Sequence, residues 1–301
     1  MAYYMLAVLA VFFWSFNVIV GTYFIGVLLP WQIAFIRWFI AALVLVPITF
    51  KHIIQYKNVL LKHWQLIFWL SLIGIAISNT CVYYASYTVS AIEMSLFSVT
   101  GPVFLIIFSW IFLGISLSLK QQLGLVITLF GLVMVIVHGR LENLLEMRFV
   151  TGDLWMLAMA STFGLYSFLM SKKPKELPQL TLLSVTVIVG MILTIPYFII
   201  ECQANPLTDH NMTPTVIGIM LYMGIFNSFL AYLFWNAALD KMGELKVGSL
   251  YYLMPIFSTI EAHLILSERI YLSQVFGGII IIIGILLTNA KRKKRLRIER
   301  A

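Results

Sequence analysis

The sequence predicts an all-α, polytopic membrane protein with ten transmembrane helices, arranged as two inverted five-helix repeats. Three observations lead to this prediction: an apolar composition, a series of membrane-length apolar runs and an internal repeat. Of the 301 residues, 61% are apolar and only 11% are charged, whereas a soluble domain carries roughly 25% charged residues. Because so few polar side chains cannot cover a water-exposed globule, the chain is expected to lie in a bilayer.

Ten apolar runs follow one another along the chain, and each is close to the roughly 20 residues that cross a bilayer as a helix. Since every backbone polar group must find a partner inside lipid, continuous apolar runs are expected to be helical. The expected helices span residues 5–28, 31–50, 64–87, 91–113, 121–138, 152–171, 180–200, 214–237, 246–267 and 271–289.

An internal repeat divides these runs into two sets of five. Residues 84–133 match a later segment at a shift of 153 positions, and the sparse residue types coincide. The matches include Pro102 with Pro255, Gln121 with Gln274, Gly124 with Gly277 and Gly131 with Gly284. The predicted units are residues 1–149, residues 150–290 and a basic tail, residues 291–301. Because five is odd, the second copy is expected to lie upside down, an arrangement typical of secondary transporters.

Lysine and arginine are unevenly distributed between the two sets of connectors. With both termini placed inside, the inner connectors and the tail hold sixteen of these residues and the outer connectors hold three. Because positive charge favours the cytoplasmic side, we expect a protein of the bacterial inner membrane with both termini cytoplasmic. A basic run directly after an apolar helix is expected to meet anionic lipid headgroups, so nucleic acid is not an expected partner.

Two charged residue types, one Arg and one Glu, are expected deep inside predicted spans, at Arg37 and Glu261. A charge at the centre of a membrane helix costs roughly 2.5–3.5 kcal/mol on insertion scales, so each needs a reason. Arg37 either binds a carboxylate of a solute or holds neighbouring helices through their carbonyl groups. Glu261 can carry a coupling proton, bind a solute ammonium or remain neutral against a neighbour such as His263, and proton coupling is the prediction.

The remaining candidates are prolines, and polar or aromatic residues within spans. Pro102 and Pro255 each remove a backbone hydrogen bond, and we predict that they act as hinges. A solute cavity needs a few polar groups among aromatic walls. The predicted solute-binding residues are Trp14, Asn17, Arg37, Asn79, Tyr84, Tyr166, Asn236 and Tyr251. An interfacial belt is the alternative for residues near span ends, namely Tyr83, Tyr84, Tyr87 and Trp235.

Short motifs, in order and in both halves, resemble a known family. They are Trp14-Ser15-Phe16-Asn17, Phe35-Ile36-Arg37-Trp38 and Gly101-Pro102-Val103-Phe104, then Met254-Pro255-Ile256-Phe257 and Ser267-Glu268-Arg269. Together they resemble the EamA family of the drug/metabolite transporter superfamily. The resemblance implies ten helices, a central cavity and transport of metabolites, often export of amino acids or related compounds. Glu268 departs from the repeat, because Gly114 and Ile115 fall at its place in the first half.

The function expected from these observations is secondary transport of a small organic metabolite by alternating access. No Walker A pattern is present, so proton coupling or facilitated flux remains. With Arg37 as the lone intramembrane cation, an uncharged, zwitterionic or monocarboxylate solute fits better than a phosphorylated sugar. A non-transporting scaffold and an integral-membrane enzyme are the alternatives. Cysteine and histidine spacing predicts no metal and no cofactor. The expected partners are the solute and lipids, and both a monomer and a homodimer stay open.

Overall fold

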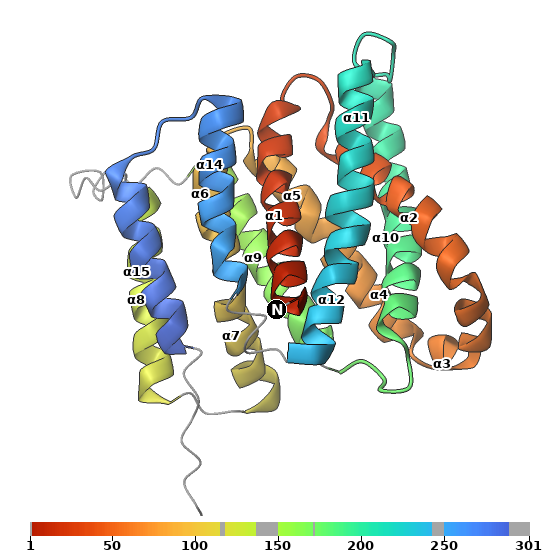
Figure 1. Ribbon diagram of the computed structural model, residues 1–301, viewed down its shortest axis with the longest axis horizontal. Coiled ribbons are helices and arrows are strands. Elements are labelled where there is room, and N and C mark those ends of the chain that lie inside the picture. Colours follow the sequence, from red (N-terminus) through yellow and green to blue (C-terminus); the bar gives the residue numbers. More distant parts are fainter. Residues whose placement is uncertain (1, 115–117, 137–149, 171, 243–249, 289–301) are drawn as a thin grey trace, which may run out of the picture.

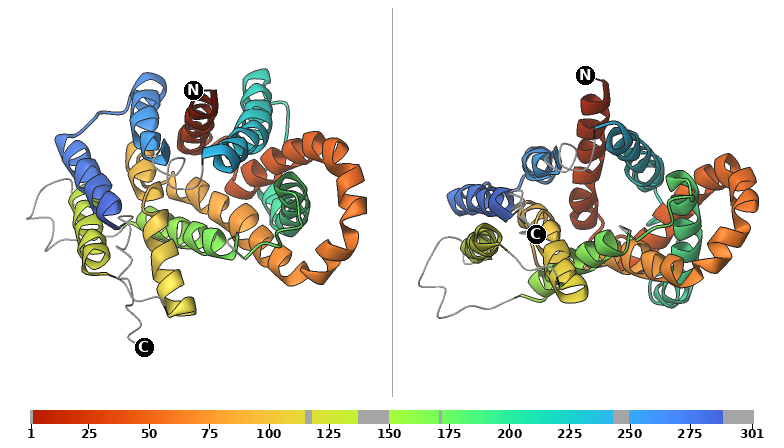
Figure 2. Two further views of the ribbon diagram at one scale, coloured as in Figure 1. Left: turned by 60° about the horizontal axis from the view of Figure 1, so that its bottom comes forward. Right: turned by 90° about the horizontal axis from the view of Figure 1, so that it is seen from below.

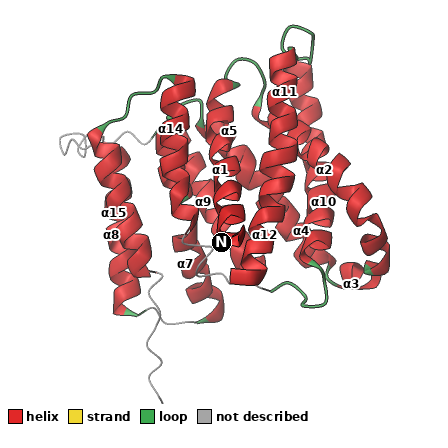
Figure 3. Cartoon of the chain, viewed as in Figure 1, coloured by secondary structure: helices red, strands yellow, loops and turns green. Residues whose placement is uncertain are grey.

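The computed structural model describes residues 2–114, 118–136, 150–170, 172–242 and 250–288 (Figure 1). The regular elements within these segments are all helical (Figure 3). The prediction of an all-α fold is therefore confirmed for the described part of the chain. Residues 291–301, the predicted basic tail, lie outside it.

Six helical stretches within the described segments are long and apolar enough to cross a membrane. They coincide with the first, second, third, sixth, seventh and eighth predicted spans. They are α1 (Ala2–Tyr23), α2 (Pro30–Gln55), the run α4–η1–α5 (Trp64–Leu70, Ser71–Ile77, Ser78–Ala85), α9 (Thr151–Met170), α10 (Gln179–Ala204) and the run α11–η3–α12 (Pro214–Tyr222, Met223–Leu230, Ala231–Met242).

The other four predicted spans fall on shorter helices. They correspond, in order, to α6 (Ala91–Ser98) with α7 (Gly101–Leu113), α8 (Leu119–Ile136), η4 (Tyr251–Leu253) with α14 (Met254–Leu266), and α15 (Leu272–Thr288). A further short helix, α3 (Lys57–Lys62), follows α2. Taken singly, these helices are shorter than the roughly 20 residues of a full crossing. The count of ten and the inverted repeat therefore remain predictions.

Pro102 and Pro255 each lie in the first turn of a helix rather than inside a continuous one. The chain leaves helical geometry between α6 and α7, and the tighter turn η4 precedes α14. A proline in the first turn costs no hydrogen bond, because its missing N–H would have no helical partner there. The expectation that each proline removes a helical hydrogen bond is wrong, whereas their role as hinges stays a prediction.

Two irregular features recur at positions that the repeat relates. The widened π-helical turn η1 shifts by 153 onto residues 224–230, which lie within η3, the second π-helical segment. Left-handed residues end α7 and α14 at Gly114 (φ 63°) and Ser267 (φ 55°), which are also 153 apart. A left-handed conformation is unusual for a serine, so a left-handed residue at the ends of both α7 and α14 is a specific similarity between the two helices.

The pair α8 and α15 packs through glycines. A Cβ atom added to Gly131 would lie 2.8 Å from the backbone N of Ile281 and 3.0 Å from the carbonyl O of Gly277. A Cβ atom on Gly284 would lie 2.8 Å from the carbonyl O of Gly124. The contacts pair the first glycine of one helix with the second of the other, so the helices are antiparallel. These glycines are therefore helix-packing sites, because small residues let two helices approach closely.

Helix α1 packs against helices of both predicted repeats, among them α5, α6, α12 and α14. It lies between α14 and α12 in the views of Figure 2 and contacts both. The α8–α15 pair lies at one end of the long axis of the molecule, and α2, α3 and α10 lie at the other (Figure 1).

The outer surface of the bundle is apolar. Large side chains such as Leu43, Val126 and Leu264 are more than half exposed. Apolar surface on this scale needs lipid rather than water around it. The composition, the long apolar helices and this surface together identify an integral membrane protein.

Candidate functional site

Arg37, on α2, is buried in the middle of the bundle with 1% of its surface exposed. Its Nε donates to Ser228 Oγ at 2.6 Å. Its Nη1 donates to Asn17 Oδ1 at 2.8 Å, to Tyr83 Oη at 2.9 Å and to Asn79 Oδ1 at 3.0 Å. The Tyr83 hydroxyl in turn donates to Asn17 Oδ1 at 2.9 Å. Arg37 is therefore held by α1, α5 and η3, which include both predicted repeats.

Two of the hydrogen-bond partners of Arg37 lie in or next to the π-helical segments. Ser228 belongs to η3, and Asn79 follows η1 by two residues. The Asn79 amide donates 3.0 Å to the carbonyl O of Gly74, which lies within η1. A π turn misaligns the regular helical hydrogen bonds and is often found at functional sites. The same turn brings the ring of Tyr166 so close to Gly74 that a Cβ atom there would lie 2.3 Å from it.

The charge of Arg37 is not balanced by a carboxylate in the described segments. All four of its hydrogen-bond partners are neutral oxygens, and the guanidinium carbon lies 4.7 Å from the centre of the Trp38 ring. Removing a cation from water without an anionic partner costs several kcal/mol. A site that retains such a charge is suited to an anion supplied from outside the chain.

Aromatic side chains from both predicted repeats cluster beside Arg37. The Trp14 ring lies 5.2 Å from Tyr232, 5.2 Å from Trp235 and 6.1 Å from Tyr251. Phe163 lies 6.2 Å from Tyr251, and their planes are nearly parallel. These centroid distances are typical of favourable ring pairs. The cluster comprises Trp14, Trp38, Phe163, Tyr166, Tyr232, Trp235 and Tyr251.

Trp14 also ties α1 to η3. Its indole N–H donates to the backbone O of Asn227 at 3.1 Å, and the Asn227 amide donates to the backbone O of Phe13 at 2.6 Å. The reciprocal bonds orient the Trp14 ring toward the aromatic cluster, so its position is set by backbone as well as by ring contacts.

Glu261 lies on the other side of α1 from Arg37. Its Oε1 lies 2.7 Å from Ser15 Oγ, and its Oε2 is buried without a hydrogen-bond partner. Ser15, which contacts Glu261, and Asn17, which contacts Arg37, are two residues apart and so point about 200° apart around α1. The two ionisable residues therefore contact α1 from nearly opposite sides.

Most of the predicted solute-binding residues lie together. Asn17, Asn79 and Arg37 form the polar part, and Trp14, Tyr166 and Tyr251 belong to the aromatic cluster. The side chains of Asn236, on α12, and of Pro102 lie outside the described residues. Pro255 is buried in the first turn of α14.

Tyr84 lies apart from this group. Its hydroxyl donates to Glu201 Oε1 at 3.2 Å, and its ring stacks on Trp155. Glu201, in the last turn of α10, also accepts from the backbone N–H groups of Trp31 and Gln32 at the start of α2. A carboxylate at a helix N-terminus satisfies unpaired donors, so Tyr84 belongs to a helix-capping cluster.

Several residues of the site were not found from the sequence. The interpretation of Tyr83 as an interfacial residue is wrong, because it is 1% exposed and bonded to Arg37. Ser228, Phe163 and Tyr232 were also missed. One signal was available for Tyr232, because the repeat shift of 153 relates it to Asn79.

Comparisons with known proteins agree with this description. An "uncharacterized transporter" of Archaeoglobus fulgidus is 27% identical over 267 residues, which cover 87% of this chain and 89% of the relative. The "uncharacterized transporter YyaM" of Bacillus subtilis is 26% identical, with 83% and 80% of the two chains covered.

A solved structure, described as "Crystal structure of protein", superposes on this chain with a TM-score of 0.64 and 18% sequence identity. It covers 95% of this chain and 96% of that one, which shows a shared fold. Residues 1–137 and 150–290 both match the EamA-like transporter family. The chain, an integral membrane protein, therefore belongs to the EamA-like transporter family.

Proposed function

We propose that this protein is a secondary transporter that carries a small organic solute across the bacterial inner membrane by alternating access. The observation that supports this most directly is Arg37, a buried cation held by both predicted repeats beside aromatic side chains from the same two repeats. Transporters with inverted repeats place their substrate near the midplane, between the repeats. The site around Arg37 is likewise built from residues of both predicted repeats.

The features shared by the two halves support the exchange of conformations that alternating access needs. The π-helical turns η1 and η3 and the left-handed ends at Gly114 and Ser267 recur at one shift. The matched helices α8 and α15 pack antiparallel, as inverted copies would. Two similar halves can adopt each other's conformations, so the two access states have similar energies. Pro102 and Pro255, next to the breaks that precede α7 and α14, are the proposed hinges.

Glu261 is the proposed site of a coupling proton. Ser15 Oγ lies 2.7 Å from Glu261 Oε1 and 2.6 Å from the carbonyl O of Phe12, yet a serine hydroxyl has only one proton to donate. Both contacts are satisfied when a protonated Glu261 donates to Ser15 and Ser15 donates to Phe12. A neutral carboxyl also explains how the unpartnered Oε2 is tolerated, because a buried carboxylate would cost far more. After deprotonation the Ser15 hydroxyl would instead donate to the Glu261 carboxylate and leave the carbonyl O of Phe12, so the proton changes the hydrogen bonding between α14 and α1.

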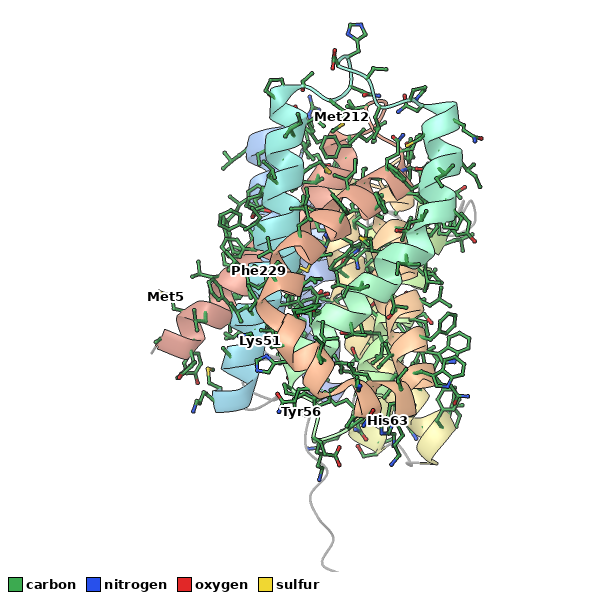
Figure 4. The ribbon with its side chains drawn as sticks, turned by 90° about the vertical axis from the view of Figure 1, so that its right-hand side faces the viewer. Met5, Lys51, Tyr56, His63, Met212 and Phe229 are labelled. Carbon is green, nitrogen blue, oxygen red and sulfur yellow. The ribbon has the colours of Figure 1, made fainter. Side chains whose placement is uncertain are left out.

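The proposed direction of transport is export, as the family resemblance implies. The excess of Lys and Arg in one set of connectors supports an orientation with both termini in the cytoplasm. In Figure 4, Met5 and Lys51 lie toward one end of the bundle and Met212 toward the other. The first end would face the cytoplasm.

The test is uptake and efflux of a labelled solute panel by proteoliposomes, with and without a pH gradient. The panel would hold uncharged, zwitterionic and monocarboxylate metabolites. Wild-type protein would be compared with Glu261→Gln and with Glu176→Gln, a matched control on the exposed connector between α9 and α10.

A proton-coupled carrier moves at least one solute faster under a pH gradient, and this acceleration disappears in Glu261→Gln but not in Glu176→Gln. If a solute moves at the same rate with and without the pH gradient, and in wild type and Glu261→Gln alike, the protein is a facilitator and Glu261 has no role in proton coupling. If no solute moves, the transport proposal gives way to a scaffold.

A further inference from the structure

Three tyrosine hydroxyls in the aromatic cluster have no hydrogen-bond partner among the described residues. They belong to Tyr166 on α9, Tyr232 on α12 and Tyr251 in η4. Other unpaired polar atoms, such as Tyr222 Oη and Trp38 Nε1, are sealed from solvent, whereas these three phenol oxygens are not. Buried phenols normally find a partner, so three open hydroxyls within the bundle indicate a space that a ligand or water occupies.

The rings that carry the three hydroxyls lie in the aromatic cluster beside the guanidinium. The Tyr232 ring lies 6.4 Å from the ring of Trp38, which the guanidinium carbon of Arg37 approaches to 4.7 Å, and Tyr166 and Tyr251 join the cluster through Phe163. Arg37 uses Nε and Nη1 for its four hydrogen bonds, so its Nη2 makes none with the described residues. One guanidinium nitrogen and three phenol hydroxyls in this region are therefore left to bind a ligand. Guanidinium and phenol donors together suit the oxygens of an anion.

No group in the described segments offers the space a negative charge. Two acidic side chains are buried in the described segments. Glu261 contacts α1 at Ser15, on nearly the opposite side from Asn17 and Arg37, and Asp153 accepts from the backbone N–H of Val150 at the start of α9. Glu93, Glu201 and Glu268 lie at helix ends, where each accepts from backbone N–H groups. A solute ammonium placed beside Arg37 would meet a like charge and find no counter-ion. Such a group costs more to desolvate than the neutral hydrogen it replaces.

The walls of the space fit an apolar body. Trp14, Trp235 and Phe163 surround Tyr232 and Tyr251 at ring distances of 5.2–6.2 Å. Apolar and aromatic walls with a few directed polar groups are usual for small-molecule sites.

We propose that this site selects organic monocarboxylates over both amino-acid zwitterions and neutral amides. The carboxylate binds Arg37 Nη2 and the hydroxyls of Tyr166, Tyr232 and Tyr251, and an uncharged apolar body packs on the aromatic rings. The inference rests on the proposed transport function, and it specifies the substrate among the uncharged, zwitterionic and monocarboxylate classes that the sequence left open.

The test uses two matched series, each on one carbon skeleton. The first is 3-phenylpropanoate, 3-phenylpropanamide and phenylalanine, and the second is butanoate, butanamide and 2-aminobutanoate. Binding to purified protein in detergent is followed by quenching of tryptophan fluorescence, and flux is followed in proteoliposomes at pH 7.5 against empty liposomes. In at least one series the acid is expected to bind at least about tenfold more tightly than its amide and its amino acid.

Tyrosine variants test the site itself. Tyr232→Phe keeps the ring and removes one donor, so it is expected to weaken binding of the acid several-fold and to leave the amide unchanged. Tyr23→Phe, on an exposed tyrosine at the end of α1, is the control and should change neither. Arg37→Lys keeps the charge but not the planar donor pair, and it should also weaken binding of the acid. Because Tyr232→Phe is conservative, the test does not depend on whether the Arg37 variant folds.

The outcomes distinguish the monocarboxylate inference from the transport proposal. An amide or amino acid that binds as tightly as its acid in both series overturns the monocarboxylate inference, and flux of that solute leaves the transport function standing. Equal effects of Tyr232→Phe and Tyr23→Phe on acid binding also overturn the inference. Acid binding that depends on Tyr232 without flux of any solute supports the site and refutes transport. Absence of both binding and flux refutes both proposals.

Discussion

Replacing Gly284 with alanine is expected to force α15 away from α8. The added Cβ atom would lie 2.4 Å from Thr128 Oγ1, 2.5 Å from Thr128 N and 2.8 Å from the carbonyl O of Gly124. The N and O atoms belong to the backbone of α8, so no side-chain rotation relieves these contacts. In a bilayer, where water does not drive helices together, such close approach is a main source of helix association.

The size of the effect follows from two opposing contributions. Overpacking a close contact typically costs about 1–3 kcal/mol, and rigid backbone neighbours favour the upper end of that range. Alanine returns at most about 1 kcal/mol through its better helix propensity. The net loss is about 2 kcal/mol, which raises the ratio of unfolded to folded protein roughly 30-fold.

The assay is thermal unfolding of the purified protein in one detergent, with two matched glycine controls. A Cβ atom added to Gly218, on α11, would have no described residue within 4 Å, so Gly218→Ala should leave the midpoint unchanged or raise it. A Cβ atom added to Gly278 would meet, among the described residues, only the flexible Leu96 Cδ2 at 2.9 Å, so Gly278→Ala should fall between the other two. A midpoint for Gly284→Ala equal to that of Gly218→Ala would refute the close backbone contact between α8 and α15.

Three further substitutions test single contacts. Trp14→Phe keeps an aromatic side chain, although a smaller one, and removes the indole N–H that donates to Asn227 at 3.1 Å. The lost bond should lower the free energy of unfolding by denaturant by at least about 0.5–1.5 kcal/mol, and an unchanged free energy would contradict that bond. Glu268→Ala removes the acceptor at the start of α6, so amide hydrogen exchange there should become faster, by a loss of about 0.5–2 kcal/mol in protection free energy. Glu201→Ala should have the same effect at the start of α2 and none at the start of α6. Equal exchange at both helix starts in both variants would show that neither carboxylate caps a specific helix.

The helices were largely predictable because lipid restricts the backbone so strongly. An apolar run of membrane length must satisfy its own hydrogen bonds, so α1, α2, α9 and α10 lie where the hydropathy of the chain indicates. The π-helical turns and the breaks before α7 and α14 were not predictable in this way. They depend on close packing, such as the ring of Tyr166 against Gly74, which no local pattern records.

The sequence could predict site residues whose burial in a membrane is energetically costly, but not those of residue types that are common in membrane helices. Arg37 stands out because a charge inside an apolar run needs a reason. Tyr83 and Tyr84 are neighbours of one residue type, yet one binds Arg37 and the other binds Glu201. Adjacent residues point about 100° apart on a helix, and sequence position does not say which neighbour each side chain meets.

The sequence by itself determined that this chain is an integral membrane protein of helices with a doubled pattern, because composition and apolar length decide the solvent. It also singled out Arg37 and Glu261, because ionisable groups are rare and expensive in lipid. Only the tertiary structure decided that α1 separates these two residues, and that aromatic rings from α9, α12 and η4 cluster beside Arg37. The physical reason is that most of these contacts join residues far apart in the chain, such as Ser15 and Glu261 at 246 positions, and such residues meet only through the packing of the helices.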